Sequence, residues 1–414
     1  MSAGNRREPA APHTTQAANP TRATEPPQAA DSAPSTHSTQ AAGPVRATNP
    51  TQGANPAPAL NSTRATDPTQ ATNPAPATTP TPPADPAHDP PVRAQPDGWF
   101  VVATSGEVRP GKVVTRQLKG QDLVIYRTTS GELQVVRPFC PHLGAHLGHG
   151  GTVRGDRLVC PFHHFQFGPD GTCVQTGYGT PPPKARLTAV DFRELDDLVF
   201  VWHHAQGKPP QWEVEPLFGP DYPKPHCTPR TLTAHPQDVL ENFVDIGHFG
   251  PLHGLSLTVL EDAVYDGHRL SIGYGLRPAG AKSGKRYSTL PTVRFTMEGL
   301  GVIHVAADDM KFGFDLRARI CVTPLDDVRS DLRVSVAMRP TGPGRRRAAR
   351  VVAGLAPALF ARAAAADTQR DAAIWAHSRF VEHPRLAKGD GPIMPFRRWA
   401  RQFYSTPQPS GTAD

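Results

Sequence analysis

The 414-residue sequence predicts an α+β protein in which a disordered N-terminal tail precedes two domains. Three observations support this prediction. The first 98 residues contain no Phe, Trp or Tyr. The next stretch, to about residue 205, consists of short β-type segments separated by turn signals. The remainder combines longer alternating segments with helical ones, and it is long enough to form a second domain.

The tail spans residues 1–97 and is rich in Pro, Ala and Thr. Such a composition cannot bury enough apolar surface to offset the entropy of ordering the chain, so we expect an extended, disordered segment. Its near-repeats, such as those at 21–24, 45–48 and 63–66, are unevenly spaced, which indicates low complexity and not a solenoid. We expect residues 406–414 to be disordered as well.

Composition excludes several classes of protein. The net charge is +7, but no aromatic residues interleave with the basic ones, so we expect no nucleic-acid partner. We find no secretory signal and no apolar run long enough to span a membrane. The five cysteines show no disulfide spacing, which favours a reducing cytoplasm. We expect a core or lid helix at residues 351–366. Because the Arg-rich segment 345–350 precedes it, an amphipathic helix at a membrane surface is the alternative.

The first domain is expected at residues 98–205 as a small antiparallel β structure. Its strands are predicted at 122–126, 133–136 and 198–202, because these segments are apolar and rich in β-branched or aromatic residues. Turn signals at 129–131 and 169–171 separate the strands. Rigid strands of this kind can present functional loops at one end.

Two loops of this domain carry a Cys-x-His and a Cys-x-x-His motif, with 17 residues between them. Thiolate and imidazole are ligands for iron and zinc. A [2Fe–2S] cluster held by two Cys and two His is the Rieske centre. We therefore assign Cys140 and Cys160 to one iron, and His142 and His163 to the other.

A structural zinc site uses the same donor types and is the alternative. Zinc sites usually pair their cysteines within one loop, whereas here each loop supplies one Cys and one His. Glycines at 144, 148, 150 and 151 favour the cluster, since backbone amides can then approach the sulfides. His146, His149 and His164 fit no ligand position and are interpreted as loop or outer-shell residues, with His164 as the rival of His163.

The second domain is expected at residues 206–405, after a Pro-rich boundary at 205–210. A protein that only carried electrons would end near residue 205. The additional length therefore favours a protein that uses the electrons, with a pure electron-transfer protein as the alternative.

This domain contains the spacing Asp-x2-His-x4-His at Asp245, His248 and His253. Residues 239–248 are predicted to be helical, with Asn242, Asp245 and His248 one turn apart on one face. A break at 250–251 would return His253 to the same point. Two His and one distant carboxylate form the facial triad that holds mononuclear iron and leaves positions open. Asn242 and Asp245 are the candidate catalytic residues beside it.

The third ligand must come from another element. Asp371 is our candidate, and Asp367, four residues earlier on the same predicted helix, is the rival.

Together these motifs resemble the Rieske non-haem iron oxygenases over residues 98–405. Segments 241–249, 371–375 and 388–404 resemble the sterol-acting branch, which includes the cholesterol 7-desaturases and the 3-ketosteroid 9α-hydroxylases. Respiratory Rieske subunits are a poorer match, because their loops carry an extra disulfide where this chain has Ala145 and Phe162.

The resemblance implies a helix-grip (START-like) catalytic domain, in which an antiparallel sheet surrounds a long helix beneath an apolar cavity. Segments 292–297, 302–305, 312–320 and 332–338 alternate as such a sheet requires. The implied cofactors are one [2Fe–2S] cluster and one mononuclear Fe(II), held by His248, His253 and Asp371. The implied partners are a ferredoxin or flavin reductase fed by NAD(P)H, and two further copies in a head-to-tail homotrimer, with Asp245 bridging to a neighbour's cluster.

The activity implied is O2-dependent desaturation or hydroxylation of a bulky hydrophobic substrate, most directly a sterol or steroid, as in the cholesterol 7-desaturases. A ketosteroid hydroxylase or an aromatic-ring hydroxylase is the enzymatic alternative. The non-enzymatic alternatives are a Rieske electron-transfer protein and a zinc-bound structural protein.

Overall fold

The computed structural model describes residues 93–280, 292–310, 313–341 and 346–406. Most of the predicted tail (1–92) and nearly all of the predicted C-terminal segment lie outside these residues. Residues 93–97, which we had assigned to the tail, are described, and Arg93 donates to Asp238 Oδ1 over 2.7 Å.

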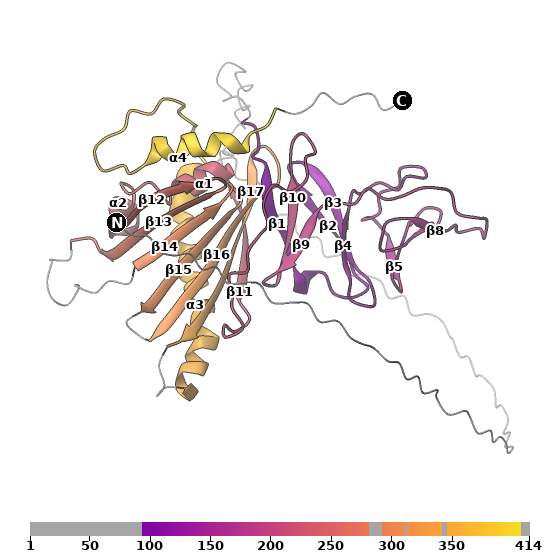
Figure 1. Cartoon of the computed structure of the whole chain (residues 1–414), viewed down its shortest axis with the longest axis horizontal. Helices are drawn as coiled ribbons and strands as arrows, with labels where there is room; N and C mark the ends of the chain where they lie inside the picture. The colour runs from indigo at the N-terminus through magenta and orange to yellow at the C-terminus, as the bar shows by residue number, and fades with distance from the viewer. Residues whose placement is uncertain (1–92, 281–291, 311–312, 342–345, 407–414) are drawn as a thin grey trace, which may run out of the picture. The chain divides into compact units, whose positions relative to one another are not determined.

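The first part of the structure is built from three small antiparallel sheets (Figure 1). The first joins β1, β10 and β9, the second β2, β3 and β4, and the third β5 to β8 in order. Their bounds are β1 Gly98–Thr104, β2 Val113–Leu118, β3 Gln121–Arg127, β4 Leu133–Val136, β5 Thr152–Arg154, β6 Arg157–Val159, β7 Gln166–Phe167, β8 Cys173–Gln175, β9 Phe192–Leu195 and β10 Leu198–His203. A short 3-10 turn, η1, spans Ser105–Glu107.

The three strands predicted from sequence in this part are confirmed as β3, β4 and β10. Their central residues, such as Val124, Ile125 and Phe200, are fully buried. Apolar strand interiors of this kind are what the β-branched and aromatic pattern predicted.

The second part is one seven-stranded antiparallel sheet in the order β11-β17-β16-β15-β14-β13-β12. Its helix α3 packs against β11 and β17 (Figure 1). The bounds are β11 His226–Thr233, α1 Pro236–Glu241, α2 Phe249–His253, β12 Leu255–Asp266, β13 Arg269–Pro278, β14 Thr292–Glu298, β15 Val302–Met310, β16 Phe314–Pro324, β17 Arg329–Pro340, α3 Arg346–Trp375, α4 Ile393–Ala400 and η3 Arg401–Phe403.

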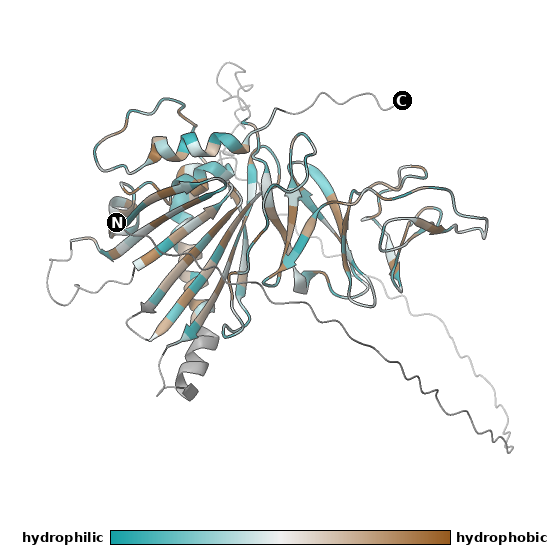
Figure 2. Ribbon diagram, in the orientation of Figure 1, coloured by the Kyte–Doolittle hydropathy of each residue, from teal (hydrophilic) through white to brown (hydrophobic). Residues whose placement is uncertain are grey.

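Hydrophobic residues alternate with polar ones along the strands of this sheet (Figure 2). One large apolar cluster fills the space between the sheet and the helices, and it includes Tyr274, Met297 and Phe396, all fully buried. The predicted strands correspond to β14, β15, β16 and β17, and the α+β fold with a helix across a sheet is confirmed.

The two parts are joined through buried polar contacts. Thr323 on β16 donates to the Val101 carbonyl over 2.7 Å. The fully buried Arg319 pairs with Asp196 at 2.8 Å and donates to the Glu215 carbonyl over 2.6 Å. A buried charge is stable only when it is paired and hydrogen-bonded, and these partners come from both parts.

Candidate metal centres

The Cys-x-His and Cys-x-x-His motifs form two matching turns. The Cys140 amide donates to the Ala145 carbonyl over 2.9 Å, and the Cys160 amide donates to the Phe165 carbonyl over the same distance. In return, the amides of Gly144 and His164 donate to the carbonyls of Cys140 and Cys160. Each motif is therefore held as a closed turn with its cysteine at the base.

The two cysteines meet inside the domain. Each is only 2% exposed. Burial raises the pKa of the Cys140 thiol to about 11, and the neighbouring Cys160 thiol adds to this rise. The His142 backbone amide lowers the pKa but does not offset the effect of burial. All five cysteines of the chain are free thiols. Two buried thiols side by side without a disulfide suit a bound cation, which stabilises both thiolates.

The two histidines lie nearer the surface than the thiols. The rings of His142 and His163 are 4.7 Å apart at an angle of 76°. His142 stacks on Phe165 with 4.2 Å between ring centroids and 9° between planes. Buried thiols below and half-buried imidazoles above form a donor set that fits a Rieske cluster.

His164, the rival of His163, has a different role in the turn. Its φ is +53°, in the left-handed region, and its side chain is exposed. It thus reverses the chain between His163 and Phe165. The backbone approach here is tight, because a Cβ on Gly177 would lie 2.2 Å from the His163 carbonyl oxygen.

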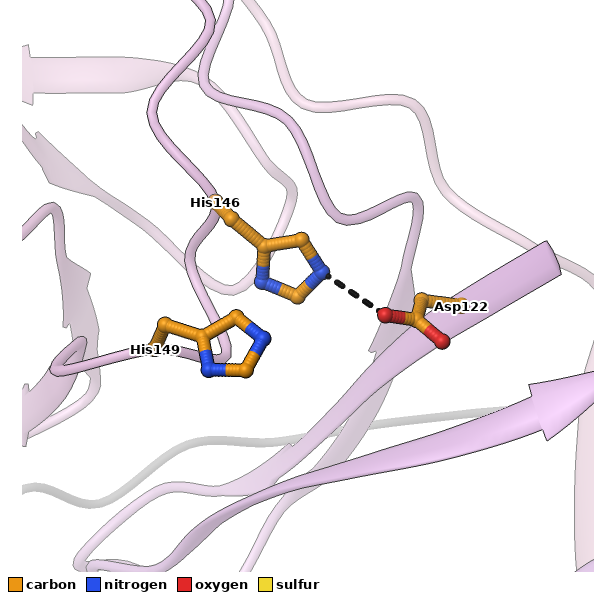
Figure 3. Close-up of side chains that lie close together, drawn as sticks. All are labelled: Asp122, His146 and His149. Atoms are coloured by element: carbon orange, nitrogen blue, oxygen red, sulfur yellow. Dashed lines mark hydrogen bonds and ion pairs between the residues drawn. The ribbon is translucent and has the colours of Figure 1, made fainter.

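Asp122, His146 and His149 form a further polar group beside the first loop (Figure 3), with ligand-type atoms within 4.8 Å of one another. Both ring nitrogens of His146 are already engaged. Nε2 lies 3.1 Å from Asp122 Oδ2, and Nδ1 accepts from the Gly148 amide over 3.1 Å. A neutral imidazole has one lone pair, and the Gly148 amide uses it. The group therefore ties the loop to β3, in agreement with our interpretation of His146 as a loop residue.

The Asp-x2-His-x4-His segment does not form the single helix that we predicted over residues 239–248. Helix α1 ends at Glu241, and turns lead to α2, which contains Gly250 and Pro251 in its first turn. Proline is tolerated there because the amides of a first turn have no intrahelical acceptor. The Ile246 amide donates to the Asp390 carbonyl over 3.1 Å, which takes it out of a helical hydrogen-bond pattern.

The rearranged segment still brings the two histidines toward a distant carboxylate. Ligand atoms of His248, His253 and Asp371 all lie within 4.8 Å of one another. His253 Nε2 lies 3.1 Å from Asp371 Oδ1, and His248 Nε2 lies 3.9 Å from the same oxygen. The histidines come from α2 and the turn before it, and the carboxylate comes from α3.

This group is largely shielded from water. Asp371 is 8% exposed, and the His253 side chain is 4% exposed. Burial raises the pKa of Asp371, although the two imidazoles act in the opposite direction. Two imidazoles and one carboxylate in largely buried surroundings match the donor set of non-haem Fe(II).

The remaining candidates surround this group. The Asn242 side-chain amide donates to Asp371 Oδ1 over 3.1 Å. Asp245 accepts from the Gly247 amide over 3.0 Å, and its backbone carbonyl lies 2.8 Å from His248 Nδ1. Asp367 Oδ1 lies 2.9 Å from His253 Nδ1, on the side of the ring away from Asp371. The structure thus brings Asp371 to the two histidine Nε2 atoms and leaves Asp367 outside.

Comparison with known proteins identifies relatives of both parts of the structure. Residues 98–187 match the Rieske [2Fe-2S] domain, and residues 201–404 match the 3-ketosteroid 9α-hydroxylase C-terminal domain. A cholesterol 7-desaturase of Xenopus laevis is 30% identical over 350 residues, covering 78% of this chain and 74% of that protein. A cholesterol 7-desaturase of Bombyx mori is 32% identical, covering 75% and 70%.

More distant relatives share the architecture. The oxygenase component of a 3-ketosteroid-9-alpha-monooxygenase from Rhodococcus rhodochrous is 27% identical, covering 77% of this chain and 86% of that protein. Among solved structures, dicamba monooxygenase bound to dicamba superposes with a TM-score of 0.53 at 16% identity, covering 76% and 98%. Pseudomonas putida NdmA gives 0.56 at 17% identity, covering 73% and 89%, for a variant with theobromine. At these identities the solved structures establish the fold.

Fold, sequence relatives and donor residues thus define an oxidoreductase with a Rieske [2Fe–2S] domain and a second domain that brings together donors for a mononuclear iron. The chain belongs to the Rieske non-haem iron oxygenases, in the branch that contains the cholesterol 7-desaturases and the 3-ketosteroid 9α-monooxygenases.

Proposed function

We propose that this chain is the oxygenase component of a system that desaturates or hydroxylates a sterol or steroid. The observation that carries the proposal is the meeting of His248, His253 and Asp371 within 4.8 Å, in a chain that also places two Cys and two His in matched loops. A pure electron-transfer protein would not need the group formed by His248, His253 and Asp371. The relatives named above, which act on cholesterol and 3-ketosteroids, give the substrate class.

The ligand assignment follows the geometry. Cys140 and Cys160 would hold the inner iron of the cluster, and His142 and His163 would hold the outer iron. His248, His253 and Asp371 would hold the mononuclear iron. When bound, these centres supply single electrons and the activation of O2.

Residues around the proposed iron ligands orient them and shield them from water. Asn242 fixes one oxygen of Asp371 by donating to it over 3.1 Å. Helix α3 and the turn that carries His248 exclude most water from the three donors, since two of their side chains are only 4% and 11% exposed. Low exposure strengthens the attraction between the carboxylate and a cation.

Asp245 is the proposed link between the two centres. Its Oδ2 lies 3.4 Å from His248 Nδ1, while its side chain is still 33% exposed. His163 is also partly exposed at the tip of its loop. A carboxylate at the surface can reach an imidazole of a second copy, which supports a head-to-tail homotrimer as the working assembly.

An apolar substrate is consistent with the surroundings of the site. Phe243 follows Asn242 directly and packs against Phe295 with 5.2 Å between ring centroids. Tyr274 donates to the Phe243 carbonyl over 3.1 Å, which holds this aromatic group in place. Pockets for bulky hydrophobic molecules are lined by residues of this kind with a few polar groups nearby.

The electrons would come from a separate reductase or ferredoxin, as the name of the Rhodococcus relative, an oxygenase component, indicates for that protein. No helix within the described residues is long and apolar enough to cross a membrane. We place the enzyme in the cytoplasm, where its free thiols stay reduced.

The test is reconstitution under anaerobic conditions with a ferredoxin system and NADPH, followed by exposure to O2. Cholesterol, a 3-ketosteroid and a small aromatic acid would be offered, with products identified by mass spectrometry. We expect a mass change of −2 or +16 on a steroid, and about three irons and two acid-labile sulfides per chain. Zinc in place of iron, or oxidation of the aromatic acid alone, would contradict the proposal.

A further inference from the structure

We propose that Asp367 is a positioning residue that holds the His253 ring so that Nε2 faces the iron site. The inference rests on the proposed function and extends it to a residue outside the ligand set. Asp367 and Asp371 are four residues apart on α3, so both carboxylates project from the same side of the helix.

The His253 ring lies between these two carboxylates. Its Nε2 is 3.1 Å from Asp371 Oδ1, and its Nδ1 is 2.9 Å from Asp367 Oδ1. Asp367 cannot replace Asp371 as a ligand from this position, because it occupies the opposite edge of the ring. The two carboxylates thus have different roles, although the sequence spacing left them equivalent.

His253 Nδ1 needs such a partner. The side chain is only 4% exposed, and no well-aligned hydrogen bond to Nδ1 exists within the described residues. A buried polar atom left without a hydrogen bond destabilises the folded state. The Asp367 carboxylate oxygen lies 2.9 Å from Nδ1, within hydrogen-bonding distance, and its side chain is 45% exposed, so a small rotation would align it with the ring.

The consequence for the ring is a fixed tautomer. When Nδ1 carries the proton and the Asp367 carboxylate accepts a hydrogen bond from it, Nε2 keeps the lone pair that a metal ion requires. A carboxylate behind an imidazole ligand also makes the ligand a stronger base, which strengthens its bond to a metal.

Arg370 holds Asp367 in place. Its Nη1 lies 3.3 Å from Asp367 Oδ1 and donates to the Leu252 carbonyl over 3.2 Å, directly before His253. Both side chains of the Asp367–Arg370 ion pair are exposed, and ion pairs of this kind contribute little to the stability of the fold. The pair therefore connects α3 to α2 at the ligand and has little other structural value.

The experiment compares Asp367→Ala and Asp367→Asn with Gln369→Ala, an exposed position on the same helix. Each full-length protein is purified with its cluster, whose visible spectrum and reduced-state EPR signal show that the fold is intact. Fe(II) affinity is measured by competition with a chromogenic chelator. Co(II) binding at the emptied site is measured by visible absorption, which reports ligand geometry.

We expect Asp367→Ala to weaken Fe(II) binding about 10–100-fold and to alter the Co(II) spectrum. Asp367→Asn should weaken it less, because the amide oxygen can still accept from Nδ1. Gln369→Ala should match the unmodified chain. Unchanged affinity in Asp367→Ala, or an Asn variant no better than the Ala variant, would overturn the proposal.

Complete loss of iron in Asp367→Ala, equal to the loss in Asp371→Ala, would also overturn it, because that result would identify Asp367 as a ligand. Failure of the proposed function gives a different result. In that case the unmodified chain itself would bind no Fe(II) at the site, and this result would overturn the positioning role of Asp367 together with the proposed function.

Discussion

Asn242 and Asp371 are far apart in sequence, yet the Asn242 amide donates to Asp371 Oδ1 over 3.1 Å. The same oxygen lies 3.1 Å from His253 Nε2. One carboxylate oxygen is thus fixed by an amide on one side and faces an imidazole on the other. Asn242 was expected to be a catalytic residue, and its contact is with the proposed iron ligand.

Replacing Asn242 should therefore weaken iron binding. In Asn242→Ala the carboxylate of Asp371 loses a donor that holds its orientation, and we expect about a 10-fold or greater loss of Fe(II) affinity. Asn242→Asp should be worse, since it places a second negative charge beside a buried carboxylate. Iron content after dialysis against a chelator measures both effects. Full retention of iron in both variants would show that Asp371 is oriented without this amide.

Glu107 connects the two parts of the structure. Its Oε2 accepts from the Thr104 amide over 2.6 Å and from Arg333 on β17 over 2.7 Å. Burial raises the pKa of this carboxyl, but the Thr104 amide and Arg333 outweigh burial and lower the pKa to about 2. The Glu107 carboxylate is thus stabilised in the folded state.

A lowered pKa in the folded state gives stability that is present above the unfolded pKa of 4.5 and is lost as pH falls toward 2. Because the side chain is 34% exposed, we expect a contribution of about 1–2 kcal/mol. Glu107→Gln should therefore lower the free energy of unfolding by that amount at pH 7. The difference from the unmodified chain should shrink between pH 4.5 and 2 in urea titrations. A constant difference across that range would exclude the carboxylate as its source.

The strands of the sheet interior were predictable because they alternate or are continuously apolar. The edge strands β11 and β12, and the neighbouring strand β13, were not predictable in this way. β11 has only one buried residue and contains Pro229, and β12 has no buried residue and is irregularly paired. β13 has buried glycines at 273 and 275, where a Cβ would lie 2.8 Å from Glu261 and 3.1 Å from Leu260 on β12. Sequence periodicity cannot reveal contacts that depend on a neighbouring strand.

The candidate iron site was likewise only partly predictable from the sequence. The residue types and their local spacing indicated His248, His253 and a carboxylate on a later helix, and the structure brings Asp371 to the pair. The predicted helix through Asp245 was wrong, because the Ile246 amide bonds to the Asp390 carbonyl, a partner that lies in a distant segment. Spacing on α3 could not separate Asp367 from Asp371, since only the position of the His253 ring distinguishes them.

Gly177 is predicted to be essential for the second cluster loop. A Cβ at this position would lie 2.2 Å from the His163 carbonyl oxygen and 3.0 Å from the His164 Cβ, so Gly177→Ala must displace the turn. We expect the variant to lose the cluster's visible absorption while it keeps the ability to bind Fe(II) at the other centre. Gly219→Ala is the matched control, because a Cβ there meets nothing within 4 Å. A normal cluster spectrum in Gly177→Ala would show that the loop tolerates a shift of this size.

Asp245→Asn tests the connection between the two centres. Asp245 Oδ1 accepts a hydrogen bond from the Gly247 amide over 3.0 Å in the unmodified chain. An asparagine has the same shape and keeps an oxygen that can accept this bond, so the turn should remain folded. The negative charge near His248 Nδ1, at 3.4 Å, is lost. We expect both metals to be retained and chemical reduction of the cluster to be unchanged. Turnover should fall by about 10–100-fold, as for other residues that support a metal ligand without binding the metal.

The decisive measurement for Asp245 is the rate at which a chemically reduced cluster is reoxidised by O2 in the presence of substrate, followed by stopped-flow absorption. A slow rate with full iron occupancy places the defect between the centres, because each centre is then intact by itself. Mixing Asp245→Asn with a variant that lacks only the cluster, such as His163→Ala, adds a test of the assembly. In a head-to-tail trimer, the cluster of one chain serves the iron site of its neighbour, so a fraction of mixed trimers pairs an intact Asp245 with an intact cluster. Activity that rises on mixing supports transfer across the interface, whereas activity that stays at the sum of the two variants indicates transfer within one chain.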